Sequence, residues 1–355
     1  MIAELPAYED AWRADWSAHG TADTVCAATL AKRLRDPIWR HAPRQPWRTA
    51  FRYALGWWGL SLVRELVHRS GPEMAPTLAE ALADLFAAVP LKAKRIARRN
   101  LRLVFPEAAE AWRRETLRRN LYEVVRTLMA TVALERLRPH EVLEQVRTTG
   151  EAHLAAALDQ GRGAVVLTGH YGPFPLGFTR LAAAGWPVAV IVRRQKDVVF
   201  EDHWKKLRDR FGVLSIPHQP ARLSVGLALK HLRSGGLLYM AGDQKAPGED
   251  YSVPFFGHKV HTHGLPARLS LHTGAPLLTA FVTFNEPSSQ RMTLSVEPPL
   301  ASPSCPPATC RSQSQEAVVE LLRGYHRRLE AAIRRRPPAW WWLHNRFHRW
   351  PGHGP

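Results

Sequence analysis

The stretch GRGAVVLTGHYGPFP, residues 161–175, decides the fold class of this 355-residue chain. Its central part, AVVLTG, is a short apolar run bounded by glycines, which predicts a strand buried on both faces. A helical pattern starts directly afterwards, at Phe174. A strand followed at once by a helix is the repeating unit of sheets that are largely parallel and covered by helices.

The same alternation of strands and helices continues on both sides of this stretch, from Val146 onward. We therefore expect an α/β fold with a largely parallel central sheet flanked by helices. In such sheets, active groups gather where strands end and helices begin. Further strands are predicted at residues 146–150, 187–192, 213–217, 237–242, 276–284 and 291–298, with helices at 151–160, 174–185, 200–212, 221–235 and 262–274.

Two regions precede this core, which we place at residues 141–355. Residues 1–48 are polar, rich in tryptophan and punctuated by prolines, and they show no recognisable chemistry. The acidic N-terminus lacks the long apolar core of a signal peptide. Residues 49–140 have helical patterns, including a long helix predicted at 108–137.

The apolar segment Tyr53–Val63 within the helical region is much shorter than the ~20 residues that cross a bilayer. It contains two tryptophans and is flanked by Arg52 and Arg64. Either an interfacial helix or a buried core helix fits this pattern. We expect the N-terminal helical region to associate with a membrane surface.

The formal net charge of +18 is unusual for a chain with 45% hydrophobic and 23% charged residues. It predicts an acidic partner, such as nucleic acid, anionic lipid, a phosphorylated substrate or an acidic carrier protein. One basic segment has no acid until Glu107, which favours contact with phosphate or lipid headgroups over a merely solvated helical face. Its basic residues are Lys92, Lys94, Arg95, Arg98, Arg99 and Arg102.

The C-terminal segment, residues 334–350, contains five arginines, four tryptophans and no acid. This composition suits a membrane interface or a nucleic-acid strand, and it equally suits a segment that packs on the body of the protein. No recognisable nucleic-acid-binding module accompanies it, so binding to nucleic acid is not expected.

A single histidine, His170, stands where the strand of residues 164–169 ends. Histidine suits a general base near neutral pH, and the start of the following helix could stabilise a developing oxyanion. Gly169 and Gly172 on either side allow a ligand to approach the backbone. Catalysis and a purely local hydrogen bond both remain open from these residues alone.

Another apolar strand ends at Asp243 and Gln244, where an acid can pair with a base, hold an arginine or cap a turn. The histidines 258, 261 and 263 lie close together, but no carboxylate accompanies them at a spacing that suits a metal ion. Cys305 and Cys310 share a loop rich in proline and serine, again without further ligands. Neither a metal nor an organic cofactor is expected.

Five blocks in the same order carry a resemblance to a known family. The chain resembles the bacterial lipid A biosynthesis acyltransferases, the lauroyl/myristoyl transferases of the lysophospholipid acyltransferase-like superfamily, over about residues 50–350. The blocks are RRNLRLVFPE (98–107), GRGAVVLTGHYGPF (161–174), LRDRFGVLSIP (207–217), GGLLYMAGDQ (235–244) with VPFFGHKVHTHGLPARLSLHTGAPLL (253–278), and PAWWWLHNRFH (338–348).

The resemblance implies a glycerolipid-acyltransferase-like fold and the transfer of a fatty acyl chain from acyl carrier protein to a hydroxyl of a lipid A precursor or related glycolipid. It places the protein at the cytoplasmic face of the bacterial inner membrane, as a peripheral or interfacially anchored protein. The partners implied are acyl carrier protein, an anionic lipid and the membrane surface.

The motif of this family is a histidine with an acid five positions later. His170 matches the histidine, whose role in the family is that of general base, whereas Pro175 stands in place of the acid. Asp243, which resembles the family's own Asp-Gln position, is the first candidate to replace that acid, and Glu201 and Asp202 are poorer ones.

Several further residues complete the expected site. Arg210 resembles a family arginine and is expected to act in catalysis, while Arg193 and Arg194 could hold phosphate or steady an oxyanion. Phe255 and Phe256 are expected to line a dry groove for the acyl chain. The remaining expected substrate contacts are Gly169, Gly172, Gln244 and Gly257.

The proline at position 175 keeps another class of function open, that of a catalytically silent relative that binds lipid or acyl carrier protein. A different acceptor, such as a phosphatidylinositol mannoside, also stays open, because similar proteins serve such lipids.

Overall fold

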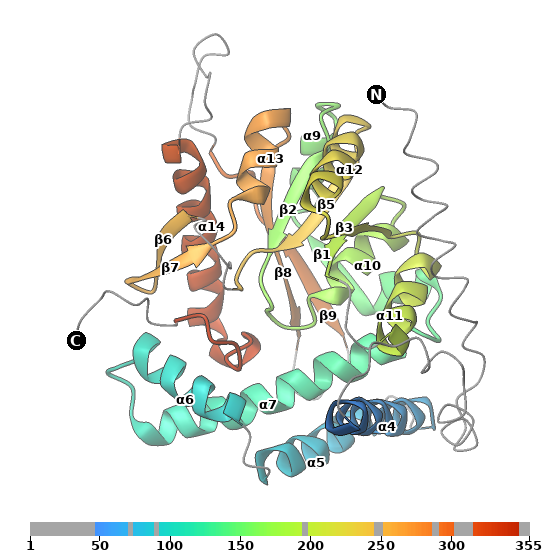
Figure 1. Ribbon diagram of the computed structural model, residues 1–355, viewed down its shortest axis with the longest axis vertical. Helices are drawn as coiled ribbons and strands as arrows, with labels where there is room; N and C mark the ends of the chain where they lie inside the picture. Colours follow the sequence, from blue (N-terminus) through green and yellow to red (C-terminus); the bar gives the residue numbers. More distant parts are fainter. Residues whose placement is uncertain are drawn as a thin grey trace. The chain divides into compact units, whose positions relative to one another are not determined.

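The structure is a computed structural model that describes residues 47–69, 74–88, 92–193, 198–244, 251–285, 291–301 and 315–347 (Figure 1). The chain divides into two compact units. The smaller unit consists of residues 1–66 with 195–203, and the larger unit consists of residues 67–194 with 204–355.

A seven-stranded sheet forms the centre of the larger unit, in the order β1-β9-β8-β2-β5-β3-β4. Every neighbouring pair is parallel except β8 and β9, which are antiparallel. The predicted, largely parallel α/β sheet is therefore confirmed. The strands are β1 (Val146–Thr149), β2 (Ala164–Thr168), β3 (Val188–Val192), β4 (Leu214–Pro217), β5 (Leu237–Ala241), β8 (Leu277–Phe284) and β9 (Met292–Val296).

Helices cover both faces of this sheet (Figure 1). Side chains of a strand point alternately to its two faces, and in β2 Val165 and Leu167 join one apolar core while Ala164 and Val166 join the other. The first core packs on α12 (Ala221–Arg233), α13 (Leu265–Thr273) and α14 (Gln315–Arg335), and the second on α8 (Pro139–Gln145), α9 (Glu151–Leu158) and α10 (Pro175–Ala183).

Ahead of α8 and the first strand, the larger unit contains α5 (Ala75–Ala88), α6 (Lys92–Val104) and α7 (Glu110–Ala133). The helix predicted at 108–137 is thus shorter at both ends. Ala109 already has an extended backbone, and Arg138 before Pro139 is extended as well, because a residue ahead of proline avoids the helical region.

The basic face predicted on α6 needs one correction. Lys94 is only 7% exposed, and its ammonium group donates hydrogen bonds to the carbonyl oxygens of Phe86 and Ala87 at the end of α5. A lysine in this position satisfies carbonyls that have no partner within their own helix. The other basic residues of the segment, such as Arg95 and Arg98, are exposed.

A short antiparallel hairpin of β6 (Tyr251–Phe255) and β7 (His258–Thr262) was not predicted. Its two turn residues, Phe256 and Gly257, both have positive φ angles, of 49° and 76°. A two-residue turn with two positive φ angles matches the twist of the strands, but it usually carries Asn-Gly rather than Phe-Gly. The usual sequence signal is therefore missing here.

The C-terminal segment packs on the body of the larger unit after the short helix η1 (Pro337–Ala339). Trp340 and Trp342 are 1% and 0% exposed, and Trp340 forms an isolated bridge with Tyr171. The side-chain amide of Asn120 on α7 donates to the carbonyls of Pro338 and Trp340, both at 2.7 Å. For this part of the segment, the packed alternative is confirmed; Trp350 lies outside the described residues.

The smaller unit contains most of α4 (Trp47–Arg69) and the first turns of α11 (Val198–Arg210). Trp57 is 8% exposed and packs edge-on against Phe200 and His203, with ring centroids 6.2 and 6.0 Å away, whereas Trp58 is 49% exposed. The helix therefore combines features of both alternatives drawn from its sequence. Among the described helices, none has the length and apolarity needed to cross a membrane.

Candidate active site

His170 and Asp243 meet at one edge of the central sheet. β2 and β5 are parallel neighbours with Thr168 opposite Ala241, so the residues two positions beyond each strand lie side by side. His170 Nδ1 lies 2.7 Å from Asp243 Oδ1, and the backbone N–H of His170 donates to Oδ2 at 2.8 Å. The structure thus brings the expected base together with the first candidate acid.

The Asp243 carboxylate is 3% exposed and accepts a third hydrogen bond, from Trp340 Nε1 at 2.8 Å. Burial alone would raise the pKa of this carboxyl group. The charge and hydrogen bond of His170, together with the bond from Trp340, outweigh burial and lower the pKa to about 2. Asp243 is therefore ionised at every pH at which the protein would work.

The His170 ring has its second nitrogen, Nε2, available as a base. An ionised Asp243 fixes the proton on Nδ1, which leaves a lone pair on Nε2. Burial lowers the pKa of His170. The charge of Asp243 and its hydrogen bond raise this pKa by more than burial lowers it, so the pKa of His170 lies above the usual histidine value. The ring of Phe174 packs against the imidazole at a centroid distance of 4.7 Å.

Gln244 occupies the open nitrogen of the histidine. Its side-chain Nε2 lies 3.0 Å from His170 Nε2 and donates to it, while the Gln244 side chain itself is exposed. A hydroxyl group that loses its proton to His170 has to replace this amide. Gln244, which was expected to contact substrate, therefore lies next to His170 Nε2, the atom that would accept the proton.

Arg346 holds the chain around Gln244 from behind. This arginine is 2% exposed and donates to the carbonyls of Gln244 and His261, at 2.8 and 2.5 Å, and to Thr262 Oγ1 at 2.7 Å. It also lies 3.2 Å from His326 Nε2. Burial and the charge of Arg346 lower the pKa of His326 to about 3, so this histidine is neutral and accepts the bond.

The two glycines beside His170 serve the protein itself. A Cβ at Gly172, where φ is +54°, would lie 2.1 Å from the carbonyl oxygen of Val282. A Cβ at Gly169 would lie 3.2 Å from Asp243 Oδ2 and 3.0 Å from a Leu329 methyl group. The close approach predicted for a ligand is made by neighbouring strands and by the carboxylate instead.

Pro175 is the first residue of α10. Proline is favoured at this position, because its missing N–H would have no helical partner there. The position that carries the acid in the family motif therefore begins α10 in this chain. The carboxylate that contacts His170 is that of Asp243, which follows β5.

The expected arginines are distributed differently. Arg210 donates to the carbonyls of Glu135 and Leu137, the latter at 3.0 Å, and so satisfies the chain just beyond the end of α7. These contacts give it a structural role, and its expected part in catalysis stays a prediction. Arg193 is exposed directly after β3, at the same edge of the sheet as His170, and Arg194 lies outside the described residues.

The two phenylalanines fill the core. Phe255 is 0% exposed and packs on Trp340 and Phe347, with ring centroids 5.5 and 5.8 Å away, and Phe256 is 8% exposed. Gly257 forms the hairpin turn. This packing does not support the expected acyl groove at these residues. Phe255 instead packs against the indole of Trp340, which donates a hydrogen bond to Asp243.

The poorer acid candidates, Glu201 and Asp202, belong to the smaller unit, whereas the His170–Asp243 pair lies in the larger one. The three histidines of the hairpin do not form a metal centre: within the described ranges, no group of three or more His, Cys, Asp or Glu side chains could hold an ion. Cys305 and Cys310 fall outside those ranges.

Trp340, Arg346 and Asn120 were missed as parts of the site. Each acts through a contact with a residue far away in the sequence: the separations are 97 residues for Trp340–Asp243, 102 for Arg346–Gln244 and 220 for Asn120–Trp340. The block PAWWWLHNRFH was the one available signal, since it places both Trp340 and Arg346 in a segment shared with the resembled family.

A sequence model described as bacterial lipid A biosynthesis acyltransferase matches residues 42–349. No match was found among curated proteins.

Proposed function

The chain belongs to the family of bacterial lipid A biosynthesis acyltransferases, and on that basis we propose that it transfers a fatty acyl chain from acyl carrier protein to a hydroxyl of a lipid A precursor or related glycolipid. The observation that carries the proposal is the 2.7 Å contact between His170 Nδ1 and Asp243 Oδ1. It supports an active enzyme despite Pro175, because an ionised acid orients the imidazole from another strand.

His170 acts as the general base. Its Nε2 takes the proton of the acceptor hydroxyl as the oxygen attacks the carbonyl carbon of the acyl thioester. The tetrahedral intermediate then breaks its C–S bond, and the departing thiolate takes the proton from the imidazolium. An ester and the free carrier thiol result, and His170 returns to its neutral form.

Asp243 fixes the Nδ1–H tautomer and stabilises the imidazolium formed during the attack. Gln244 leaves Nε2 when the acceptor hydroxyl arrives. Arg193, exposed at the same edge of the sheet, is available for a phosphate of the acceptor or for the acidic carrier.

We place the protein peripherally on the cytoplasmic face of the inner membrane. Exposed Trp58 and Leu62 on α4, at 49% and 58%, suit an interfacial position, and the exposed arginines of α6 suit anionic headgroups.

The test is acyl transfer followed by mass spectrometry. The detergent-solubilised protein receives lauroyl- or myristoyl-loaded acyl carrier protein and a tetra-acylated lipid A precursor, with a phosphatidylinositol mannoside as a second acceptor. His170→Ala is expected to lower the rate by at least about 100-fold. Asp159→Asn, an exposed acid outside the site, is the control.

An acyl mass gain on the lipid A precursor that vanishes with His170→Ala supports the proposal, and gain on the mannoside alone would redirect it to that acceptor. If no acceptor gains mass while carrier or lipid still binds, the catalytically silent alternative holds. Activity that survives His170→Ala would contradict the mechanism.

A further inference from the structure

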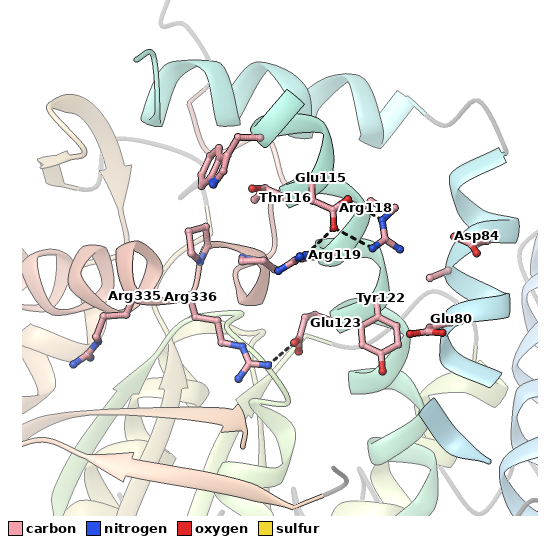
Figure 2. Close-up of a pocket in the computed structure, with 14 residues that line it drawn as sticks. Glu80, Asp84, Glu115, Thr116, Arg118, Arg119, Tyr122, Glu123, Arg335 and Arg336 are labelled. Carbon is pink, nitrogen blue, oxygen red and sulfur yellow. Dashed lines mark hydrogen bonds and ion pairs between the residues drawn. The ribbon is translucent and has the colours of Figure 1, made fainter. Parts of the chain in front are cut away.

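A separate pocket lies between α5, α7 and the start of η1 (Figure 2). Its volume is about 650 Å³, within the ~300–1,000 Å³ common for small-molecule sites. None of the residues that form the His170–Asp243 site lines it. What it could bind follows from the charges on its two walls.

The α7 wall presents a cluster of positive charge. Glu115 accepts hydrogen bonds from Arg118, at 2.9 and 3.0 Å, and from Arg119 at 2.7 Å. The hydrogen bonds from both arginines lower the pKa of Glu115 to about 2, so the cluster combines one negative and two positive charges. Each guanidinium keeps further N–H groups for an anion, because arginine has five such donors.

The α5 wall presents negative charge. Glu80 and Asp84 are one helical turn apart, and both side chains are exposed. Within the part of the chain that the structure describes, neither carboxylate forms an ion pair, unlike Glu115. Figure 2 shows the ring of Tyr122 beside Glu80. Two carboxylates next to an aromatic ring suit an ammonium group.

Exposed apolar side chains lie in the pocket lining and next to it along α5. Trp112 lines the pocket and is 39% exposed, and Leu85 and Phe86, which follow Asp84 on α5, are 62% and 40% exposed. Exposed apolar side chains of this size mark contact surfaces, and tryptophan favours the level of lipid headgroups. These side chains point to a lipid as the source of a doubly charged ligand at this place.

We propose that this pocket binds a phosphoethanolamine group, as carried by zwitterionic aminophospholipids. The phosphate accepts hydrogen bonds from Arg118 and Arg119, and the ammonium donates to Glu80 and Asp84. This ligand is neither the acyl donor nor the acceptor of the proposed reaction, and its binding is measured without acyl transfer.

The far wall of the pocket contains Arg335, Arg336, Pro337 and Pro338, and the guanidinium of Arg336 is paired at 2.6 Å with the carboxylate of Glu123, which also lines the pocket. The chain continues from there to Trp340, whose indole holds Asp243. A bound headgroup thus lies against the segment that orients the catalytic pair.

The experiment is calorimetric titration of the full-length protein with short-chain lipids below their micelle concentration. Dihexanoyl-phosphatidylethanolamine is expected to bind saturably, and dihexanoyl-phosphatidylglycerol about tenfold more weakly, because it offers no ammonium to the two carboxylates. Soluble O-phosphoethanolamine separates the headgroup from the lipid. Equal affinity for it would support the site with a free ligand, and tighter binding of the lipid would support the lipid as ligand.

Glu80→Gln combined with Asp84→Asn removes the ammonium site while keeping side-chain size. The double variant should bind the ethanolamine lipid about tenfold more weakly and leave binding of the glycerol lipid unchanged. Glu107→Gln, an exposed acid outside the pocket, is the matched control, and circular dichroism checks the fold of each variant. Equal binding of both lipids by the wild type, or no saturable binding of either, would overturn the proposal.

Discussion

Trp340 Nε1 donates a 2.8 Å hydrogen bond to Asp243 Oδ2, the carboxylate oxygen that does not contact the ring of His170. One oxygen is thus left to the imidazole, and the other is fixed by the indole and by the backbone N–H of His170. The carboxylate cannot rotate without losing one of these three bonds. The indole therefore acts as a positioning residue.

Trp340→Phe should lower kcat about tenfold and leave KM nearly unchanged, because one hydrogen bond to the acid is lost while the ring remains packed. Steady-state kinetics measure both parameters. The matched control is Trp342→Phe, since that indole is equally buried and donates to the carbonyl of Pro337 at 2.7 Å. An equal loss of kcat in both variants would reduce the role of Trp340 to structure alone.

The pH dependence of activity follows from the pKa of His170. The histidine must be neutral to accept a proton, so kcat/KM should rise with pH through a midpoint above the usual histidine pKa. Asp243→Asn removes the charge that raises this pKa but leaves burial, which lowers it. The midpoint should therefore move to lower pH while the plateau falls by at least about 100-fold.

Rate profiles between about pH 5 and 9 test this expectation, around the ordinary histidine value of ~6.5. A midpoint that stays in place in Asp243→Asn would contradict the assigned coupling. Asp159→Asn should reproduce the wild-type profile.

His326 contacts Arg346, which holds the backbone of Gln244, and its protonation should make the stability of the fold depend on pH. Its folded pKa of about 3 lies below the unfolded value, so the unfolded chain binds a proton that the folded chain excludes. Stability should therefore fall as the pH decreases from about 6.5 towards 3. His326→Gln should flatten this part of the curve, as followed by urea denaturation at several pH values. An unchanged slope would show that other groups cause the acid sensitivity.

Gly172→Ala should be severely destabilising, by roughly 3 kcal/mol or more, because it combines a positive φ with a Cβ placed against a backbone carbonyl. Gly161→Ala is the control, with a φ of +70° and open space around the Cβ. That variant should lose only about 1 kcal/mol. Thermal melts compare the two, and equal losses would mean that the contact with Val282 is not limiting.

Arg346→Gln should cost about 3 kcal/mol, since four polar partners around it lose their donor in the protein interior. Chemical denaturation measures the loss. Arg327→Gln on α14, a 69% exposed arginine, should change stability by less than about 1 kcal/mol. If Arg346→Gln leaves the free energy of unfolding unchanged, the aromatic packing around Phe255 would be what stabilises this region.

The sequence predicts the sheet well, and it places His170 and Asp243 at strand ends of that sheet, for one physical reason. Short apolar runs identify the strands, and the carboxyl ends of parallel neighbours such as β2 and β5 meet at one edge, which brings His170 and Asp243 together. Which strands are neighbours is not encoded locally, so the pairing of the two residues stayed a choice among several acids. In the structure, Asp243 is the acid that contacts His170.

The expectations that gain no support from the structure also share a cause. Phe255 was expected in an acyl groove and Arg210 in catalysis, but both are engaged by partners far away in the sequence: Trp340 and Phe347 for the ring, and the carbonyls beyond α7 for the guanidinium. Residue type and spacing carry no information on such contacts. The hairpin was missed because Phe-Gly replaces the usual turn residues.

The dependence of Asp243 on Trp340, 97 residues further along the chain, also has a consequence for synthesis in the cell. His170, Asp243 and all strands of the sheet leave the ribosome before the indole does. A nascent chain can therefore assemble its sheet and still lack an oriented acid. A protein truncated ahead of residue 340 should lack both the oriented acid and the buried Trp340 and Trp342 of the core, so the last segment made acts as a check on completeness.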